Sequence, residues 1–256
     1  MGPVDVRHPA LPDLFDPALP NAPLLFGILA GDLPGRAIAD DAEHPTMAAV
    51  QAPNAIAFTS RTTRQADFDA TLSGLRRDAT VGLVWPGDSA GSVEPEAPAR
   101  SIARLGFDAI DPADERFARL RADLPADLTV RPMDPELLAR CEWLELVVDA
   151  HGSIEAFLAR GSGLCLMRGD EIVAEAYAPF IGRGVAEVGV VTPEPHRGHG
   201  YASVAIAFLA KVLAGRGLAM YWSCDADNDA SIRVAAKLGF GPPRPFGILL
   251  YRPLEA

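Results

Sequence analysis

Residues 186–213 read AEVGVVT (186–192), PEPHRGHG (193–200) and YASVAIAFLAKVL (201–213). The first segment is rich in β-branched residues, the second holds two prolines and two glycines, and the third repeats apolar residues every four positions. This order predicts a strand, a loop and a helix, so the loop lies at a helix N-terminus. Backbone N–H groups without intrahelical partners point out of such an end, and a phosphate group fits there.

Two glycines in the loop, Gly198 and Gly200, remove the Cβ atoms that would hinder a ligand's approach. The alternative is that they serve the geometry of the turn alone. A P-loop requires Gly-x-x-x-x-Gly-Lys-Ser/Thr, which is absent, and Ser203 stands where the dinucleotide fingerprint needs its third small residue. The pattern therefore favours neither nucleotide-binding fold.

The segment Arg197-Gly-His-Gly-Tyr-Ala202 resembles the acyl-CoA loop, Arg/Gln-x-x-Gly-x-Gly/Ala, of the GNAT N-acyltransferase superfamily. A second block follows at the spacing of that superfamily, with Tyr221-Trp-Ser-Cys224, Asn228-x-x-Ser231 and Lys237-Leu-Gly-Phe240. The resemblance covers roughly residues 127 to 252. It is similar in detail to a two-lobed subfamily that includes zwittermicin-resistance-type acetyltransferases, and it implies a mixed α/β GNAT fold.

Composition limits the classes of protein that fit. The chain has 256 residues, enough for one large or two small domains, and 49% of them are apolar, so a disordered chain is excluded. The net charge is −11, and residues 1–125 hold 11 Lys and Arg against 18 Asp and Glu. This surface does not suit nucleic acid, which needs clustered cations, whereas a cationic small molecule would suit it.

The cysteines, Cys141, Cys165 and Cys224, are odd in number and contain no Cys-x-x-Cys pair. This argues against a disulfide framework and a zinc site, and it predicts a reducing cytoplasm. The N-terminus lacks the pattern of a signal peptide, and no apolar run reaches the ~18 residues of a membrane span. We expect no metal and no membrane.

The domain boundary is predicted at residues 125 and 126, giving a smaller α/β lobe at 1–125 and a GNAT domain at 126–256. The first lobe resembles a partial, non-catalytic GNAT lobe. Its expected elements are an irregular arm (1–23), strands (25–30, 36–39, 47–50, 55–59 and 81–85), helices (64–77, 98–105 and 112–121) and a mobile linker (86–100).

The GNAT domain is expected to follow the order of elements of that fold. A Gly-Asp turn between apolar runs predicts a hairpin, and the other elements follow from the periodicity of apolar residues. They are strands at 128–131, 164–168, 171–178, 186–192, 219–224 and 246–251, with helices at 134–141, after Ser153, at 201–213 and at 228–238.

The resemblance also implies where acetyl-CoA binds. The backbone of Val190, Val191 and Thr192 would pair with pantetheine as an added strand does, and one amide there would stabilise the oxyanion. The remaining expected CoA-binding residues are Arg197, Gly198, His199, Gly200, Tyr201, Ala202, Ser203, Asn228 and Ser231. Helix capping is the alternative for Asn228.

Glu187, at the start of the central strand, is the expected general base, and an exposed glutamate paired with an arginine is the alternative. The tyrosine that serves as acid in the superfamily is replaced by Ala235. Water, Ser231 or Tyr201 would then protonate the thiolate, or no acid is needed. Cys224 is expected to be a small buried side chain rather than a nucleophile.

Two functions follow. The first is transfer of an acetyl group from acetyl-CoA to the amine of a small molecule, by direct attack in a ternary complex. The second is a non-catalytic CoA-binding module that acts as a sensor or an interaction partner. We expect a monomer or a homodimer. The acceptor is expected to be selected by loops near residues 141–162 and 178–186 and by the other lobe.

Overall fold

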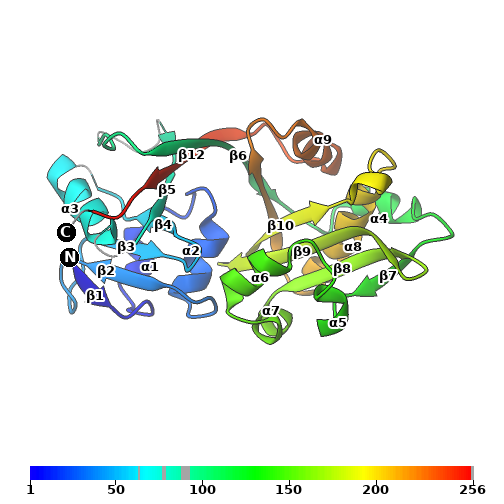
Figure 1. Cartoon of the computed structure of the whole chain (residues 1–256), viewed down its shortest axis with the longest axis horizontal. Helices are drawn as coiled ribbons and strands as arrows, with labels where there is room; N and C mark the ends of the chain where they lie inside the picture. Colours follow the sequence, from blue (N-terminus) through cyan, green and yellow to red (C-terminus); the bar gives the residue numbers. More distant parts are fainter. Residues whose placement is uncertain (63, 77–78, 88–92, 255–256) are drawn as a thin grey trace. The chain divides into compact units, whose positions relative to one another are not determined.

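A computed structural model describes residues 1–62, 64–76, 79–87 and 93–254 of the chain (Figure 1). Contacts divide the chain into two compact units, Met1–Gly106 with Arg244–Ala256, and Phe107–Pro243. Both units combine helices with a mostly antiparallel sheet, which confirms the predicted mixed α/β class. No helix in the described part of the chain is both long and apolar enough to cross a bilayer.

The first unit is built on a sheet in the order β1-β2-β3-β4-β5-β12-β6. Among the described strands of this unit, only β4 and β5 pair in parallel, and α3 connects them. Apolar side chains of α3, Phe68, Leu72 and Leu75, pack in one core with Val81 and Leu83 of β5. The elements are β1 (Gly2–Val4), α1 (Leu11–Leu14), α2 (Ala22–Leu29), β2 (Arg36–Ala39), β3 (Ala48–Gln51), β4 (Ile56–Thr59), α3 (Gln65–Arg76), β5 (Val81–Trp85), β12 (Arg244–Tyr251) and β6 (Arg100–Ile110), which runs on into the second unit.

Two predictions for this unit were wrong. The strand expected at 25–30 is part of helix α2, because Pro23 stands in its first turn and an apolar run buried on all sides has no periodicity to distinguish helix from strand. The helix expected at 98–105 is strand β6, because residues 100–106 pair with β12 from the far end of the sequence. The arm expected to be irregular contains β1 and α1, and residues 88–92 of the expected linker lie outside the described residues.

The second unit has a sheet in the order β6-β11-β10-β9-β8-β7, in which β10 and β11 are parallel and α8 connects them. One sheet face packs against α5, α6 and α7, and α8 lies along the same strands (Figure 1). The elements are α4 (Glu115–Ala122), β7 (Thr129–Pro132), α5 (Pro135–Leu138), α6 (Leu144–His151), α7 (Ile154–Arg160), β8 (Ser162–Arg168), β9 (Glu171–Gly182), β10 (Val185–Val191), α8 (Tyr201–Gly215), β11 (Ala219–Asp225) and α9 (Asp229–Leu238). The periodicity had predicted all of these except α6.

Capping residues explain where several helices begin. The Ser153 hydroxyl accepts the Ala156 N–H at the start of α7, and the Asp134 carboxylate accepts the Leu137 N–H at the start of α5. Both bonds satisfy backbone donors that have no partner inside the helix. These short polar residues therefore fix the helix boundaries that apolar periodicity leaves open.

The predicted boundary at residues 125 and 126 falls inside the second unit. Helix α4 precedes that point, yet it packs against α8, and Arg121 Nη1 donates to the Ala207 carbonyl over 2.9 Å. Phe117 of α4 is fully buried. Strand β12, at the other end of the chain, belongs to the first unit.

Replacing Phe117 with alanine tests whether α4 completes the second unit. The cavity left by the ring should lower the free energy of unfolding by about 3–5 kcal/mol. Hydrogen exchange should show lost protection in α8, whereas exposed Arg119→Ala should change stability by less than about 0.5 kcal/mol. Unchanged protection of α8 in Phe117→Ala would contradict the assignment of α4 to this unit.

Candidate functional site

The parallel pair at the centre of the second unit separates before its strands end. Val185 pairs with Ala219, Ala186 with Met220 and Glu187 with Tyr221, and there the pairing stops. Strand β10 nevertheless continues to Val191 and β11 to Asp225. The edge of residues 188–191 that faces β11 therefore has no ladder partner in the described sheet. An extended ligand can pair with such an edge as an added strand does.

Hydrogen bonds between its own residues hold the loop after β10 in place. Arg197 Nε donates to the Thr192 carbonyl over 3.0 Å, and His199 Nδ1–H donates to the Arg197 carbonyl over 2.9 Å. The His199 ring stacks on that of Tyr201 with centroids 5.3 Å apart. His196, largely buried in a single 3₁₀ turn, lies 3.0 Å through Nε2 from the Glu171 carboxylate. The first carbonyl after β10 is thus already used inside the protein.

The turn into α8 leaves several backbone N–H groups without acceptors in the described residues. Gly198 and Gly200 have φ of 80° and 82°, in the left-handed region where a side chain is strained. The N–H groups of Ser203 and Val204 donate to the Gly200 carbonyl, while those of residues 198–202 have no acceptor in the described part of the chain. These five amides stand at the positive end of a 15-residue helix, a suitable site for an anion.

Lys237 of α9 reaches the same turn. A Cβ built on Gly200 would lie 3.6 Å from the Lys237 ammonium, and one built on Gly198 would meet nothing within 4 Å. This lysine belongs to the Lys237-Leu-Gly-Phe240 block, and the sequence alone indicated no role for it. A cation beside open amides adds to the attraction for phosphate.

Two predicted ligand residues on α9 make bonds within the protein. The Asn228 side chain accepts the Ser231 N–H over 3.0 Å and so caps the helix, which was the alternative reading of this residue. The Ser231 hydroxyl accepts the indole N–H of Trp222 over 3.0 Å. Ser203 of α8 is buried as well, so its side chain faces the core.

Glu187 lies inside the protein rather than on its surface. Its side chain is 8% exposed, and its Oε1 accepts the Ser223 hydroxyl of β11 over 2.8 Å. The carboxylate therefore stands at the point where β10 and β11 cease to pair. This burial disagrees with the alternative of an exposed glutamate at a strand end.

Sequence reasoning missed two buried polar residues on β9, Glu175 and Tyr177. They alternate on the strand and so face the same side of the sheet, where Tyr177 joins the core formed with α5, α6 and α7. Glu175 Oε1 accepts the Glu142 N–H over 2.9 Å, and burial raises the pKa of this carboxyl. The only signal in the sequence was a glutamate and a tyrosine two positions apart in an apolar strand.

Tyr201, and the residue at the position of the superfamily's catalytic tyrosine, both lie away from the β10 edge or lack an acidic group. The Tyr201 hydroxyl accepts Arg168 Nη2 on β8 over 2.9 Å, two strands away from the β10 edge that faces β11. Ala235, at the position of the superfamily's tyrosine, is fully buried. Neither offers a proton to a group beside β10.

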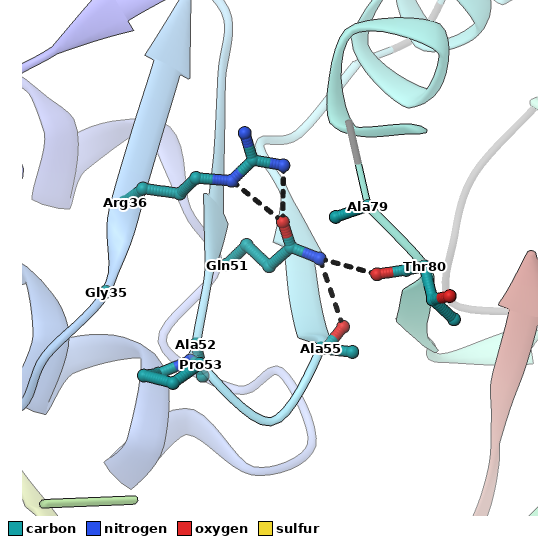
Figure 2. Close-up of a pocket in the computed structure, with 8 residues that line it drawn as sticks. All are labelled: Gly35, Arg36, Gln51, Ala52, Pro53, Ala55, Ala79 and Thr80. Atoms are coloured by element: carbon teal, nitrogen blue, oxygen red, sulfur yellow. Dashed lines mark hydrogen bonds between the residues drawn. The ribbon is translucent and has the colours of Figure 1, made fainter. Parts of the chain in front are cut away.

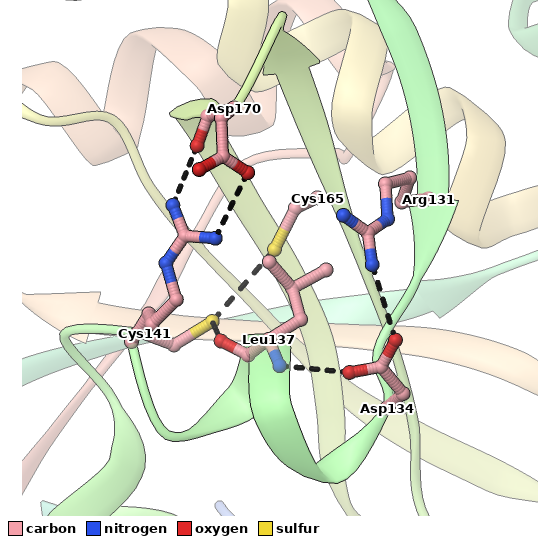
Figure 3. A network of polar contacts seen from close by, with 7 residues as sticks. Arg131, Asp134, Leu137, Cys141, Cys165 and Asp170 are labelled. Carbon is pink, nitrogen blue, oxygen red and sulfur yellow. Dashed lines mark hydrogen bonds and ion pairs between the residues drawn. The ribbon is translucent and has the colours of Figure 1, made fainter.

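The three cysteines are free and buried. Figure 3 shows Cys141 and Cys165 facing each other, with sulfur atoms 3.7 Å apart, next to the surface pair of Arg131 and Asp134. The hydrogen bond to Cys165 and burial raise the pKa of the Cys141 thiol, which keeps it protonated and unreactive. Cys224 is the small buried side chain that we expected. Residues of metal-ligand type form no cluster of three in the described residues.

A separate cavity of about 500 Å³ lies in the first unit (Figure 2). Arg36 donates two hydrogen bonds to the Gln51 side-chain oxygen and one to the Leu75 carbonyl, and Gln51 donates to the Thr80 carbonyl. These contacts tie the end of α3 to the sheet, so a structural role accounts for the arginine.

Glu175 gives the unfolding free energy a specific pH dependence. Because its folded pKa is raised, its contribution to stability is complete below the unfolded pKa of about 4.5 and is lost as pH rises through the folded pKa. Glu175→Gln keeps an oxygen for the Glu142 N–H but does not titrate. Urea unfolding across that range should show wild type losing stability relative to Glu175→Gln, and exposed Glu145→Gln should follow wild type. A constant difference between wild type and Glu175→Gln at all pH values would exclude this effect.

Comparisons with known proteins agree with this geometry. An N-acetyltransferase of Bacillus subtilis, YdfB, which is uncharacterised, is 25% identical over 224 residues, covering 84% of this chain and 85% of the relative. A GCN5-related N-acetyltransferase-like protein from Streptococcus suis shares the fold with a TM-score of 0.62 at 21% identity, over 86% of this chain and 90% of its own. A tandem GNAT protein from the clavulanic acid biosynthesis pathway has a TM-score of 0.62 at 15% identity, over 98% of this chain and 94% of its own, in keeping with two lobes. The family profile described as GNAT acetyltransferase matches residues 95–249, and the chain therefore belongs to the GNAT acetyltransferase family.

Proposed function

We propose that this acyltransferase moves an acetyl group from acetyl-CoA to the amine of a small molecule by direct attack in a ternary complex. The observation that carries the proposal is the separation of β10 from β11 next to the open amides at the start of α8. An edge for pantetheine and a site for pyrophosphate thus adjoin within one unit. Membership of the family supports acetyl transfer in general.

In this proposal the β10 edge at Val190 and Val191 binds pantetheine, and the amides of residues 198–202 bind the pyrophosphate. Lys237 contributes a positive charge at Gly200. The buried Glu187 takes the proton from the attacking ammonium, directly or through water, and Ser223 holds the carboxylate in place. The amine then adds to the carbonyl carbon, and the CoA thiolate leaves.

Charge supports a cationic acceptor, because the chain carries a net charge of −11 and an acidic protein attracts cations. The three free cysteines favour a reducing compartment such as the cytoplasm. The primary test is thiol release from acetyl-CoA with glycine, lysine, spermidine and kanamycin as amines. Binding of acetyl-CoA without any thiol release would instead support the non-catalytic module.

Replacing Gly200 with valine tests the pyrophosphate site. The β-branched side chain at φ of 82° blocks the approach to the amides, and acetyl-CoA affinity measured by calorimetry should fall about tenfold or more, which is a loss of ~1.4 kcal/mol. Gly217→Val is the matched control, since Gly217 also has positive φ and lies beyond the other end of α8. Both variants should lose about 1–2 kcal/mol of stability, but only Gly200→Val should lose affinity. Equal affinities in two folded variants would exclude this site.

Replacing Glu187 with glutamine tests the base. Turnover should fall by roughly 10²-fold near neutral pH and by less at high pH, where the amine is already deprotonated. Glu115→Gln, on the exposed surface of α4 in the same unit, should keep the wild-type rate. A Glu187→Gln enzyme with the wild-type rate across the pH range would remove Glu187 from the mechanism.

A further inference from the structure

The side chain of Tyr177 carries a hydroxyl that the protein leaves without a partner. It is 2% exposed, and its ring lies against Trp143 with centroids 4.6 Å apart. Its hydroxyl makes no hydrogen bond to any residue that the structure describes. The oxygen is not one of the fully enclosed polar atoms that lack a partner, so it keeps contact with the space outside the protein, where a bound molecule can accept its hydrogen bond.

The place of this hydroxyl is defined by Gly189. Tyr177 and Gly189 are opposite each other in the β9–β10 ladder. A Cβ built on Gly189 would lie 2.6 Å from the Tyr177 hydroxyl oxygen and 2.7 Å from its Cζ. Glycine is therefore required here because the phenol fills the space of a side chain. Gly189 lies in the part of β10 that no longer pairs with β11, so the hydroxyl stands over the edge assigned to the thioester.

Burial, together with two neighbouring carboxyl groups, keeps this phenol protonated. Burial first, and then the neighbouring Glu187 and Glu175, hold the pKa of Tyr177 well above its usual range. The group therefore keeps its proton at neutral pH. A neutral phenol of this kind donates a hydrogen bond without giving the proton away, which distinguishes it from an acid that protonates the leaving sulfur.

Resting on the proposed function, we propose that the Tyr177 hydroxyl donates a hydrogen bond to the thioester carbonyl oxygen and to the oxyanion that forms from it. The amine nitrogen bonds to the carbonyl carbon, and the carbonyl π pair moves to the oxygen, where Tyr177 and a β10 amide stabilise it. The oxygen pair then re-forms the carbonyl as the C–S bond breaks with its electron pair on sulfur. Glu187 takes the first ammonium proton before the attack and passes it to solvent, the second proton leaves nitrogen to solvent after the attack, and sulfur takes up one proton from solvent, so one proton is released in total.

Tyr177→Phe tests this assignment, because it keeps the ring against Trp143 and removes the oxygen alone. Losing one oxyanion donor should lower kcat roughly 10²-fold, with unchanged acetyl-CoA affinity by calorimetry. The melting temperature should not fall, since the lost hydroxyl had no partner in the described residues. The ratio of wild-type to variant rates should stay constant from about pH 6 to 9, because the donor does not titrate there.

The control is Tyr251→Phe in the first unit, whose hydroxyl donates to the Glu96 carbonyl over 3.0 Å. It should lower the melting temperature and leave kcat unchanged. Gly189→Ala is a second test of the Tyr177 assignment, since its methyl group displaces the phenol. Its kcat should fall, and the double variant with Tyr177→Phe should lose less than the product of the two effects.

The assay uses wild type, both tyrosine variants and Gly189→Ala with acetyl-CoA and spermidine. Wild-type kcat in Tyr177→Phe would overturn the assignment, as would a kcat that falls only together with the melting temperature. A rate ratio that changes with pH would mean proton transfer and would also overturn it. Absence of thiol release by wild type with every amine would overturn the proposed function, and this assignment with it.

Discussion

The second unit depends on one constraint: β10 and β11 pair for only three residues and then separate. Parallel strands joined by a crossover helix ordinarily bury both edges of their ladder. Here the unpaired edge of β10 leads directly into the loop that starts α8, so an open backbone edge and open helix amides follow each other along the chain. The glycines, the buried Glu187 and the phenol over Gly189 are all placed by their relation to this edge.

The first unit contains the same topology without the same site. Strands β4 and β5 are also parallel, joined by α3, and their pairing also stops early, at Ala57 with Leu83. The segment before α3 reads Ser-Arg-Thr-Thr-Arg at 60–64 and contains no glycine, the residue that most readily adopts the left-handed conformation seen at Gly198 and Gly200. Trp85 at the end of β5 packs against Phe68 of α3 with centroids 5.6 Å apart. In the proposed function, strand separation is therefore not sufficient for binding acetyl-CoA, and the glycine loop is the additional requirement.

The sequence predicted local features well and long-range ones poorly. The glycine loop, the cap at Asn228 and the hairpin of β8 and β9 depend on neighbouring residues, and all appear where the patterns indicated. Strand β6 was taken for a helix because its partner, β12, is distant in the sequence. Tyr177 was overlooked for the same reason, since its relation to Gly189 exists only through the register of two strands. Apolar periodicity has no information on register between strands.

For the polar residues beneath the β10 edge, the requirements of stability and of the proposed reaction are opposed. Glu175, Tyr177 and Glu187 are each less than a tenth exposed, and removing polar groups from water costs free energy unless bonds replace the lost hydration. Each carboxyl group accepts one such bond at Oε1, from the Glu142 N–H and from the Ser223 hydroxyl, while Glu175 Oε2 is buried without a hydrogen bond in the described residues. The phenol makes no hydrogen bond within the described residues, but its oxygen is not fully enclosed, so a bound molecule can reach it. A phenylalanine would pack against Trp143 equally well, so in the proposed function the tyrosine is accounted for by the thioester oxygen that its hydroxyl would contact.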